Sequence, residues 1–261
     1  MIENYHTHHN FCGHAEGNAW DYVEEAIKLG FSVLGISDHA PNKLINDWGV
    51  RMKESQLDEY LADIESARKK AGKKITVLSG LEVEYFPNNE EYYERLKKKT
   101  DYLIHGQHYI TEDFSYNNLK SGFGLKTKGD IFKYSEFLVQ AIESGHFLMF
   151  AHPDLYMTGY REWDKNAEEV AHIICRAAKK ENAILEFNSN GFRRGLQKTK
   201  DGLKRNYPRE EFWKIVKSYG VRTFINSDCH TPEFLYDHVI REAEEVYKEL
   251  GLKNTTVTKT K

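Results

Sequence analysis

Residues 2–9 read Ile2-Glu3-Asn4-Tyr5-His6-Thr7-His8-His9, a short strand pattern over 2–8 that ends in a run of histidines. Alternate side chains of a strand point to the same side, so His6 and His8 can converge on one metal ion. An open, doubly wound parallel sheet usually carries a glycine-rich turn after its first strand, and here histidines stand in that place. The stretch therefore favours a barrel with metal ligands at its mouth, and the open sheet is the alternative.

The rest of the chain repeats the order of strand, polar cluster and helix, without an internal low-complexity linker. Parallel neighbours in a sheet need crossover helices, so seven such repeats in one direction predict a parallel α/β fold. Over 261 residues we expect the sheet to close, or nearly close, into a barrel of the TIM-barrel kind. The expected strands are 2–8, 31–38, 74–85, 101–109, 146–152, 183–189 and 221–228. The expected helices are 19–29, 55–71, 89–99, 129–144, 165–180, 208–219 and 232–250.

Three connections that follow strands are long, and they cover 111–128, 153–164 and 190–207. In a barrel they would lie on the C-terminal face, where the active sites of such barrels are found. We expect residues 1–250 to form this one barrel, and the tail 251–261 to be frayed with its lysines in solvent.

Composition excludes several classes of protein. With 37 Lys and Arg against 40 Asp and Glu, the net charge of −3 argues against a protein that holds nucleic acid mainly by bulk charge. No apolar run approaches the roughly 18 residues of a membrane span. The N-terminus shows no basic segment followed by an apolar one, so no signal peptide is expected. Three distant cysteines (Cys12, Cys175 and Cys229) form no disulfide framework, which makes a reducing cytoplasm the expected location.

Metal-ligating side chains fall at the ends of six of the seven expected strands. A lone histidine at a strand end is usually a hydrogen-bonded structural residue. However, unrelated histidines would not gather at the same end of successive strands, and several charged groups at a barrel mouth would be costly without cations. Imidazole and carboxylate ligands suit zinc, iron and manganese, so a multinuclear metal site is predicted. The groups are His6 and His8, Asp38 and His39, Glu82 and Glu84, His105 and His108, His152 and Asp154, and Asp228 and His230.

These residues carry a family resemblance that runs in order over 1–232. The motifs resemble those of the polymerase-and-histidinol-phosphatase (PHP) superfamily. The resemblance implies a distorted (β/α)7 barrel that binds two or three divalent metal ions, commonly zinc, iron or manganese. The matching motifs are His6-Thr7-His8, Ser37-Asp38-His39, Gly80-Leu81-Glu82, the histidine at 108, Ala151-His152-Pro153 and Asp228-Cys229-His230.

Carried over residue by residue, the resemblance implies a ligand set. Glu82 would bridge two metals, with Glu84, on the same strand face, as the alternative. His108 falls at the family's ligand position, and His105 would be an extra ligand or a substrate contact. The first metal would be held by His6, His8, Glu82 and Asp228, the second by Glu82, His108 and His152, and the third by His14, His39 and His230.

A single barrel without a polymerase or second domain resembles the histidinol-phosphatase branch of the superfamily. The resemblance implies a phosphoric monoester hydrolase of histidine biosynthesis that converts L-histidinol phosphate to L-histidinol and phosphate. Two metals could activate a bridging hydroxide for attack on phosphorus, with Glu82 among the catalytic groups. The leaving oxygen needs a proton, and the candidate donors are Asp228, His230 and Asp154.

Phosphate recognition usually calls for guanidinium groups. The long loops supply Arg161, Arg193 and Arg194, and the stretch 188–193 resembles a phosphate-binding segment of the family. Arg161 and Arg193 are therefore the expected substrate contacts.

Three rival functions remain open. Another phosphoesterase of the same superfamily, acting on nucleotides, sugar phosphates or phosphotyrosine, would share the site and differ in its loops. An exonuclease would need a stronger positive field than this chain offers. A non-catalytic metal-binding barrel is disfavoured, because a ligand stands at every family position. No oligomeric state is predicted.

Overall fold

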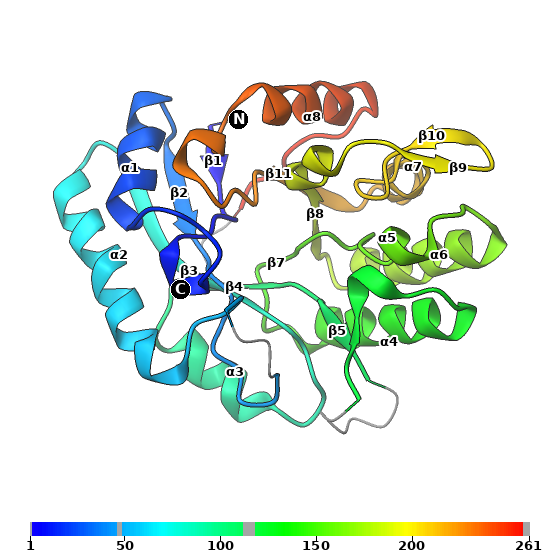
Figure 1. The fold of residues 1–261 in the computed structure, drawn as a ribbon, viewed down its shortest axis with the longest axis horizontal. Coiled ribbons are helices and arrows are strands. Elements are labelled where there is room, and N and C mark those ends of the chain that lie inside the picture. The colour runs from blue at the N-terminus through cyan, green and yellow to red at the C-terminus, as the bar shows by residue number, and fades with distance from the viewer. Residues whose placement is uncertain (1, 46–48, 112–117, 258–261) are drawn as a thin grey trace.

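A parallel seven-stranded sheet forms the centre of the computed structural model, which describes residues 2–45, 49–111 and 118–257. Neighbouring strands pair in the order β1-β2-β3-β4-β7-β8-β11 (Figure 1). The strands are β1 (Glu3–Asn4), β2 (Val33–Ile36), β3 (Thr76–Val83), β4 (Tyr102–His105), β7 (Met149–Phe150), β8 (Ile184–Asn188) and β11 (Arg222–Asn226). All seven predicted strands are confirmed, in the predicted order and direction.

The first and last strands nearly close the sheet into a barrel. Thr7 and Cys229 form a parallel β-bridge, and the His8 amide donates to the Cys229 carbonyl at 2.9 Å. On the N-terminal side of this bridge, asparagine side chains accept from backbone amides where hydrogen bonds between the backbones of β1 and β11 would otherwise be expected. Asn226 Oδ1 accepts from the Tyr5 amide at 2.8 Å, and Asn4 Oδ1 accepts from the Ser227 amide at 2.7 Å. The predicted (β/α)7 barrel is therefore confirmed in its nearly closed form.

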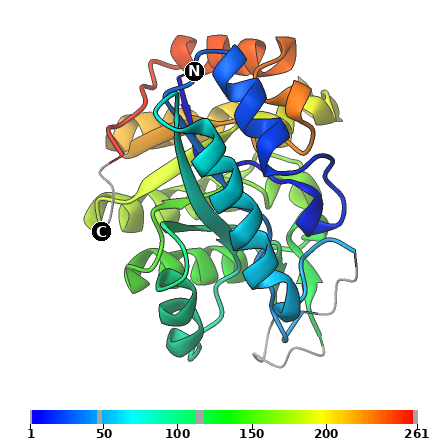
Figure 2. The same ribbon diagram turned by 90° about the vertical axis from the view of Figure 1, so that its left-hand side faces the viewer.

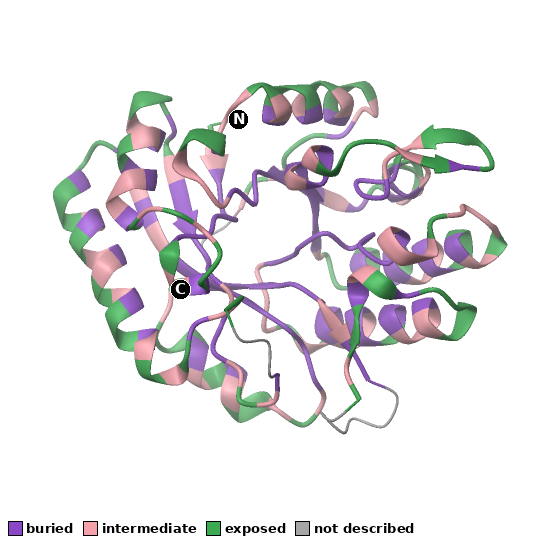
Figure 3. Ribbon diagram, viewed as in Figure 1, coloured by how far each residue is buried: buried purple, intermediate pink, exposed green. Residues whose placement is uncertain are grey.

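Long helices surround the strands and bury their inner faces, as Figures 1 and 3 show. Figure 2 shows α1 and α2 side by side on the outside of the barrel. Side-chain oxygens of Asn18, Thr127, Asp164 and Asp237 cap the first turns of four of them, satisfying amides that have no partner within the helix. The helices are α1 (Ala19–Lys28), α2 (Leu57–Ala71), α3 (Glu90–Lys97), α4 (Lys128–Ser144), α6 (Lys165–Lys180), α7 (Glu210–Tyr219) and α8 (His238–Glu249).

The long connections contain local structure that the sequence pattern did not predict. Two antiparallel hairpins and one short helix lie in them, all after barrel strands. They are β5 (Tyr109–Ile110) with β6 (Lys120–Ser121), β9 (Gln197–Thr199) with β10 (Gly202–Lys204), and α5 (Met157–Tyr160). The expected strand 101–109 is thus divided into β4 and β5, because residues 106–108 are not in a strand and β5 pairs with β6.

An apolar layer fills the N-terminal half of the barrel interior. It consists of Tyr5, Tyr102, Ile104, Met149, Ile184 and Phe224, all buried. The Tyr102 ring lies so close to Gly35 and Gly80 that a Cβ at either glycine would overlap it. Its hydroxyl donates to the Tyr5 carbonyl at 2.6 Å. This layer closes the barrel below and leaves only the C-terminal half for polar side chains.

The C-terminal tail is not frayed as far as residue 257. Leu252 is buried, and Asn254 forms a parallel bridge with Thr223. Asn254 Oδ1 accepts from the Ile225 amide at 2.9 Å, and Val257 packs on the apolar layer. The expectation of a frayed tail is wrong up to residue 257, because the tail pairs with backbone groups on the edge of β11. Residues 258–261 lie outside the described residues.

The three cysteines are free and buried. Within the described residues, no helix has both the length and the apolar composition to cross a bilayer.

Candidate metal centre

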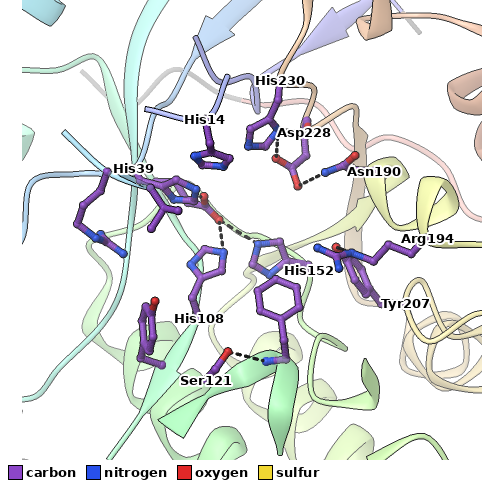
Figure 4. A pocket seen from close by; sticks show the side chains of 15 residues that line it. His14, His39, His108, Ser121, His152, Asn190, Arg194, Tyr207, Asp228 and His230 are labelled. Carbon is purple, nitrogen blue, oxygen red and sulfur yellow. Dashed lines mark hydrogen bonds and ion pairs between the residues drawn. The ribbon is translucent and has the colours of Figure 1, made fainter. Parts of the chain in front are cut away.

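A pocket of about 260 Å³ opens at the C-terminal ends of the barrel strands. Figure 4 shows the rings of His14, His39, His108, His152 and His230 directed toward one another in it. Its wall also contains Glu82 and Asp228, and His6 and His8 lie buried beside them. Side chains from six strand ends therefore meet in one place, as predicted.

The first cluster consists of His6, His8 and Asp228. His6 Nδ1 lies 2.8 Å from Glu186 Oε1 and donates to it, which leaves Nε2 as the nitrogen that could bind a metal. The Nε2 atoms of His6 and His8 are 3.0 Å apart, and Asp228 Oδ1 lies 3.4 Å and 3.1 Å from them. Three electron-pair donors converge at these distances.

The second cluster consists of His39, Glu82 and His108, with His152 beside it. Glu82 Oε2 lies 2.9 Å from His39 Nδ1, and Oε1 lies 3.0 Å from His152 Nε2 and 3.6 Å from His108 Nε2. Oε2 is also 3.5 Å from the Nε2 atoms of both histidines of the first cluster. Glu82 therefore stands between the two clusters. A Cβ at Gly106 would overlap its carboxylate, so a glycine is needed there.

The remaining histidines are grouped differently from the predicted third set. His14, His39 and His230 do line the same pocket. However, the ligand atoms of His39 and His230 group with His8, and those of His14 and His230 group with Cys12. The His8 and His230 rings are stacked with centroids 4.3 Å apart. The region near His230 can therefore hold an ion in more than one way.

Buried polar atoms without hydrogen bonds test whether these clusters fit a cation. Among the described residues, Glu82 Oε2 has no partner in hydrogen-bond geometry despite its neighbouring ring nitrogens, and neither does Nδ1 of His8, His39 or His152. Such orphaned atoms are costly in a buried site. Imidazole and carboxylate together are the ligands of zinc, manganese and iron. The clusters fit divalent metal ions.

Electrostatics points the same way. Burial alone would lower the pKa of His6, but the carboxylates of Glu186, Asp228 and Glu82 raise it well above its usual value. Burial alone would raise the pKa of Glu82, but His108, His6 and His39 hold it well below its usual value. Without a metal, the carboxylates and the imidazoles thus stabilise each other's charged forms, and a bound cation could take the place of the protonated rings.

Glu84, the alternative to Glu82, faces a different partner. Its carboxylate forms a two-point ion pair with Arg51, at 2.8 Å and 3.0 Å, and lies 3.0 Å from His108 Nδ1. The Arg51 guanidinium offsets the effect of burial and keeps the pKa of Glu84 low. Glu84 thus orients the ring of His108, whose other nitrogen faces Glu82.

His105 lies behind the pocket rather than in it. It is fully buried, its Nε2 contacts Gln107 Oε1 at 2.8 Å, and its ring packs against Phe147 and Phe150. Burial lowers its pKa to about 4. His105 is therefore not among the residues that line the pocket, whereas His108 is.

The arginines also differ from the prediction. Arg193 donates through two nitrogens to Asp237, the N-cap of α8, at 3.0 Å each, and lies over Phe234. Arg161 is exposed at the end of α5 and is not part of the pocket wall. The next residue, Arg194, lines the pocket. Residues 189–194 form a six-residue 3₁₀ segment, in which neighbouring side chains point in different directions. The sequence alone did not show which of the two neighbouring arginines faces the pocket.

Arg194 is held between two rings of the pocket wall. Its guanidinium lies 4.7 Å from the Phe123 centroid, and its Nε donates to the Tyr207 hydroxyl at 3.0 Å. The remaining guanidinium nitrogens form a positive group at the pocket rim, where Figure 4 shows Arg194 and Tyr207 together.

Asp154, a predicted proton donor, lies outside the pocket wall. It is buried, and it accepts from the Arg209 amide at 2.6 Å and from Trp213 Nε1 at 3.0 Å. Burial raises its pKa to about 7. It anchors the start of α7 and does not reach the reacting groups.

Comparisons with known proteins show the family to which this chain belongs. The family model described as PHP domain matches residues 4–190. A probable histidinol-phosphatase of Deinococcus radiodurans is 27% identical over 248 residues, covering 92% of each chain. Another from Schizosaccharomyces pombe is 26% identical, covering 87% of this chain and 80% of that one.

A solved structure shares the fold. It is histidinol phosphate phosphatase from Lactococcus lactis, complexed with zinc, L-histidinol and phosphate. The TM-score is 0.76 at 19% identity, and the match covers 99% of this chain and 97% of that chain.

Proposed function

The chain belongs to the PHP domain family, and on that premise we propose that it is a metal-dependent phosphatase that hydrolyses L-histidinol phosphate to L-histidinol and phosphate. The observation that carries the hydrolase assignment is Glu82, whose two oxygens face two histidine clusters. The substrate assignment is supported by relatives of similar length described as probable histidinol-phosphatases, and by the L-histidinol and phosphate bound in the related fold.

We assign two or three divalent ions, zinc, manganese or iron, to the clusters. The first ion would be held by His6, His8, Asp228 and Glu82, and the second by Glu82, His108 and His152, with His39 within reach. A third would lie near His14, His39 and His230. When bound, such ions lower the pKa of a water and neutralise charge on the phosphoryl oxygens.

The chain's own residues would bind and orient the ester. The Arg194 guanidinium suits two phosphoryl oxygens, because its planar fork matches their spacing. The Phe123 and Tyr207 rings hold that fork in place, at the cost of little further side-chain entropy on binding. Arg194 therefore replaces Arg193 in the proposed site, and Arg161 and His105 are not included.

Asp228 and His230 suit ligand roles better than proton donation. Burial is outweighed by His6 and His8, which keep the pKa of Asp228 well below its usual value, so it is ionised. Burial and the neighbouring His8 lower the pKa of His230 to about 3, so its ring is neutral. Its Nδ1 lies 3.1 Å from the Asp228 carbonyl, which fixes the proton there and leaves the Nε2 lone pair toward the pocket.

The direct test is phosphate release from L-histidinol phosphate by protein supplied with manganese or zinc. Nucleotide, sugar and aryl phosphates serve as the comparison panel. We expect a marked preference for L-histidinol phosphate, since a pocket of about 260 Å³ suits a compact monoester rather than a polynucleotide. Preference for another ester would support the hydrolase assignment and contradict the assignment of L-histidinol phosphate as the substrate. Metal binding with no activity on any ester would favour the non-catalytic barrel.

A further inference from the structure

Strand β8 places no imidazole in the pocket, yet two of its side chains lie directly beneath the metal centre. Glu186 and Asn188 are two residues apart, so they point to the same side of the strand, and both are fully buried. We propose that this β8 polar pair positions three metal ligands, His6, His152 and Asp228, and that metal affinity depends on it. The proposal rests on the metal centre assigned above.

Glu186 holds the ring of His6. Its Oε1 accepts from His6 Nδ1 at 2.8 Å and from Asn226 Nδ2 at 2.9 Å. A histidine that ligates a metal commonly donates its other ring N–H to a carboxylate, which fixes the tautomer and strengthens the ligating nitrogen. Here that contact leaves His6 Nε2 as the nitrogen that faces His8 and Asp228 and would ligate the metal.

The same carboxylate holds the backbone of a second ligand. Glu186 Oε2 accepts from the His152 amide at 3.2 Å. His152 has φ of 33°, a left-handed conformation that is strained for a non-glycine residue. A fixed acceptor beneath its N–H helps to keep the ring aimed at Glu82.

Asn188 connects Glu186 to a third ligand. Its Nδ2 donates to Glu186 Oε2 at 2.9 Å and to Asp228 Oδ2 at 3.0 Å. Asp228 also has a left-handed backbone, with φ of 47°. Because Oδ2 is taken by the amide, Oδ1 is the oxygen that faces the first cluster.

Charge distinguishes Glu186 from Glu84, which also contacts a histidine of the site. Glu84 is paired with the Arg51 guanidinium. The hydrogen-bond partners of Glu186 are one imidazole, two side-chain amides and one backbone N–H, and the imidazole of His6 would be neutral when its other nitrogen held a metal. Its negative charge is therefore available to the bound cations, in a buried site where screening is weak.

Substitution with glutamine tests the pair sharply. Glu186→Gln keeps the volume, but its single oxygen cannot serve all four donors, and the charge is lost. Asn188→Ala removes the contacts to Asp228 and Glu186 but keeps both carboxylates, and it serves as the second variant if Glu186→Gln does not fold. Asp154→Asn is the matched control, because it changes a buried carboxylate at the same end of the barrel that contacts none of the three ligands.

Metal-stripped proteins are titrated with zinc or manganese against a chromophoric chelator, and bound metal is counted after gel filtration. We expect Glu186→Gln to bind metal about 10–100-fold more weakly than the wild type, Asn188→Ala to be weakened less, and Asp154→Asn to bind as the wild type does. Excess metal should restore kcat of Glu186→Gln while KM stays unchanged.

The proposal is overturned if folded Glu186→Gln binds metal as tightly as the wild type, or if Asp154→Asn loses as much affinity, which would indicate general loosening. It is also overturned if Glu186→Gln does not fold and Asn188→Ala retains full affinity. Metal titration needs no substrate, so wild-type protein that binds metal through this pair but cleaves no ester would contradict only the proposed function.

Discussion

The two halves of the barrel interior are built on the same strands but from opposite chemistry. The N-terminal half holds the apolar layer of Tyr5, Tyr102, Ile104, Met149, Ile184 and Phe224. The C-terminal half holds buried imidazoles, carboxylates and amides, several of whose atoms have no hydrogen bond. The first half is filled by apolar packing, whereas the second contains clusters that fit metal ions.

Single strands show how the change occurs. On β8, the inward positions read Ile184, Glu186 and then Asn188. On β11 and the residue pair after it, they read Phe224, Asn226 and Asp228. Each strand thus passes from an apolar side chain, through a polar support, to the pocket in steps of two residues. The apolar layer fixes strand spacing, and that spacing sets where the ligands meet.

The largest expected effect comes from removing a proposed metal ligand from the polar, C-terminal half of the barrel interior. Asp228→Asn should lower kcat/KM by roughly a thousandfold, because a lost ion removes several kcal/mol of transition-state stabilisation. The melting temperature of the metal-free protein should fall, because His6 and His8 lose the ionised partner whose pKa they hold low. Bound metal and kcat are measured together; full metal content with full activity would remove Asp228 from the proposed centre.

The converse change removes a side chain from the apolar layer. Phe224→Ala should lower the free energy of unfolding by about 3–5 kcal/mol, through lost burial and a cavity. Phe224 is buried edge-on against the Tyr5 ring at 5.2 Å. Denaturant unfolding measures the loss, and metal titration of the folded variant should match the wild type. Weaker metal binding would mean that the two halves are not separable.

Two neighbouring arginines test which side chain at the pocket rim binds the phosphate ester. Arg194→Ala should raise KM for the phosphate ester about 10–100-fold, since a charge-assisted hydrogen bond contributes about 1.5–3 kcal/mol. Arg193→Ala is the matched control, because its guanidinium is occupied by Asp237. It should lose some thermal stability and keep KM. The reverse pattern would return phosphate binding to Arg193.

The smallest expected effect is a pH dependence at Asp154, a carboxylate of the polar half that binds no metal. Burial raises its pKa to about 7, whereas an unfolded aspartate titrates near 3.9. The folded state therefore binds more protons between these values, and stability from this group falls as pH rises from about 4 to 7. Asp154→Asn cannot ionise, so relative to the wild type it should gain about 2 kcal/mol between pH 5 and 7.

Unfolding of the metal-free wild type and Asp154→Asn is compared at several pH values, which cancels the titration of the shared groups. A difference that stays constant with pH would mean that Asp154 is ionised throughout.

The sequence by itself determined the barrel and most of the residues at its mouth. Alternation with a period of two and helical patterns between strands are local signals, and they predicted all seven strands in order. Histidines at successive strand ends predicted the metal-binding clusters, because parallel strands bring their C-terminal ends together. These features depend on spacing along the chain, which the sequence states directly.

Only the tertiary structure decided which of two nearby candidates enters the pocket. Glu82 faces the clusters while Glu84 pairs with Arg51, and Arg194 lines the rim while Arg193 pairs with Asp237. The docked tail and the β8 polar pair also appear only in the fold. The residues that contact the tail and the β8 polar pair lie far away in the sequence. Glu186 and His6, for example, are 180 positions apart, so no local sequence pattern could reveal this contact.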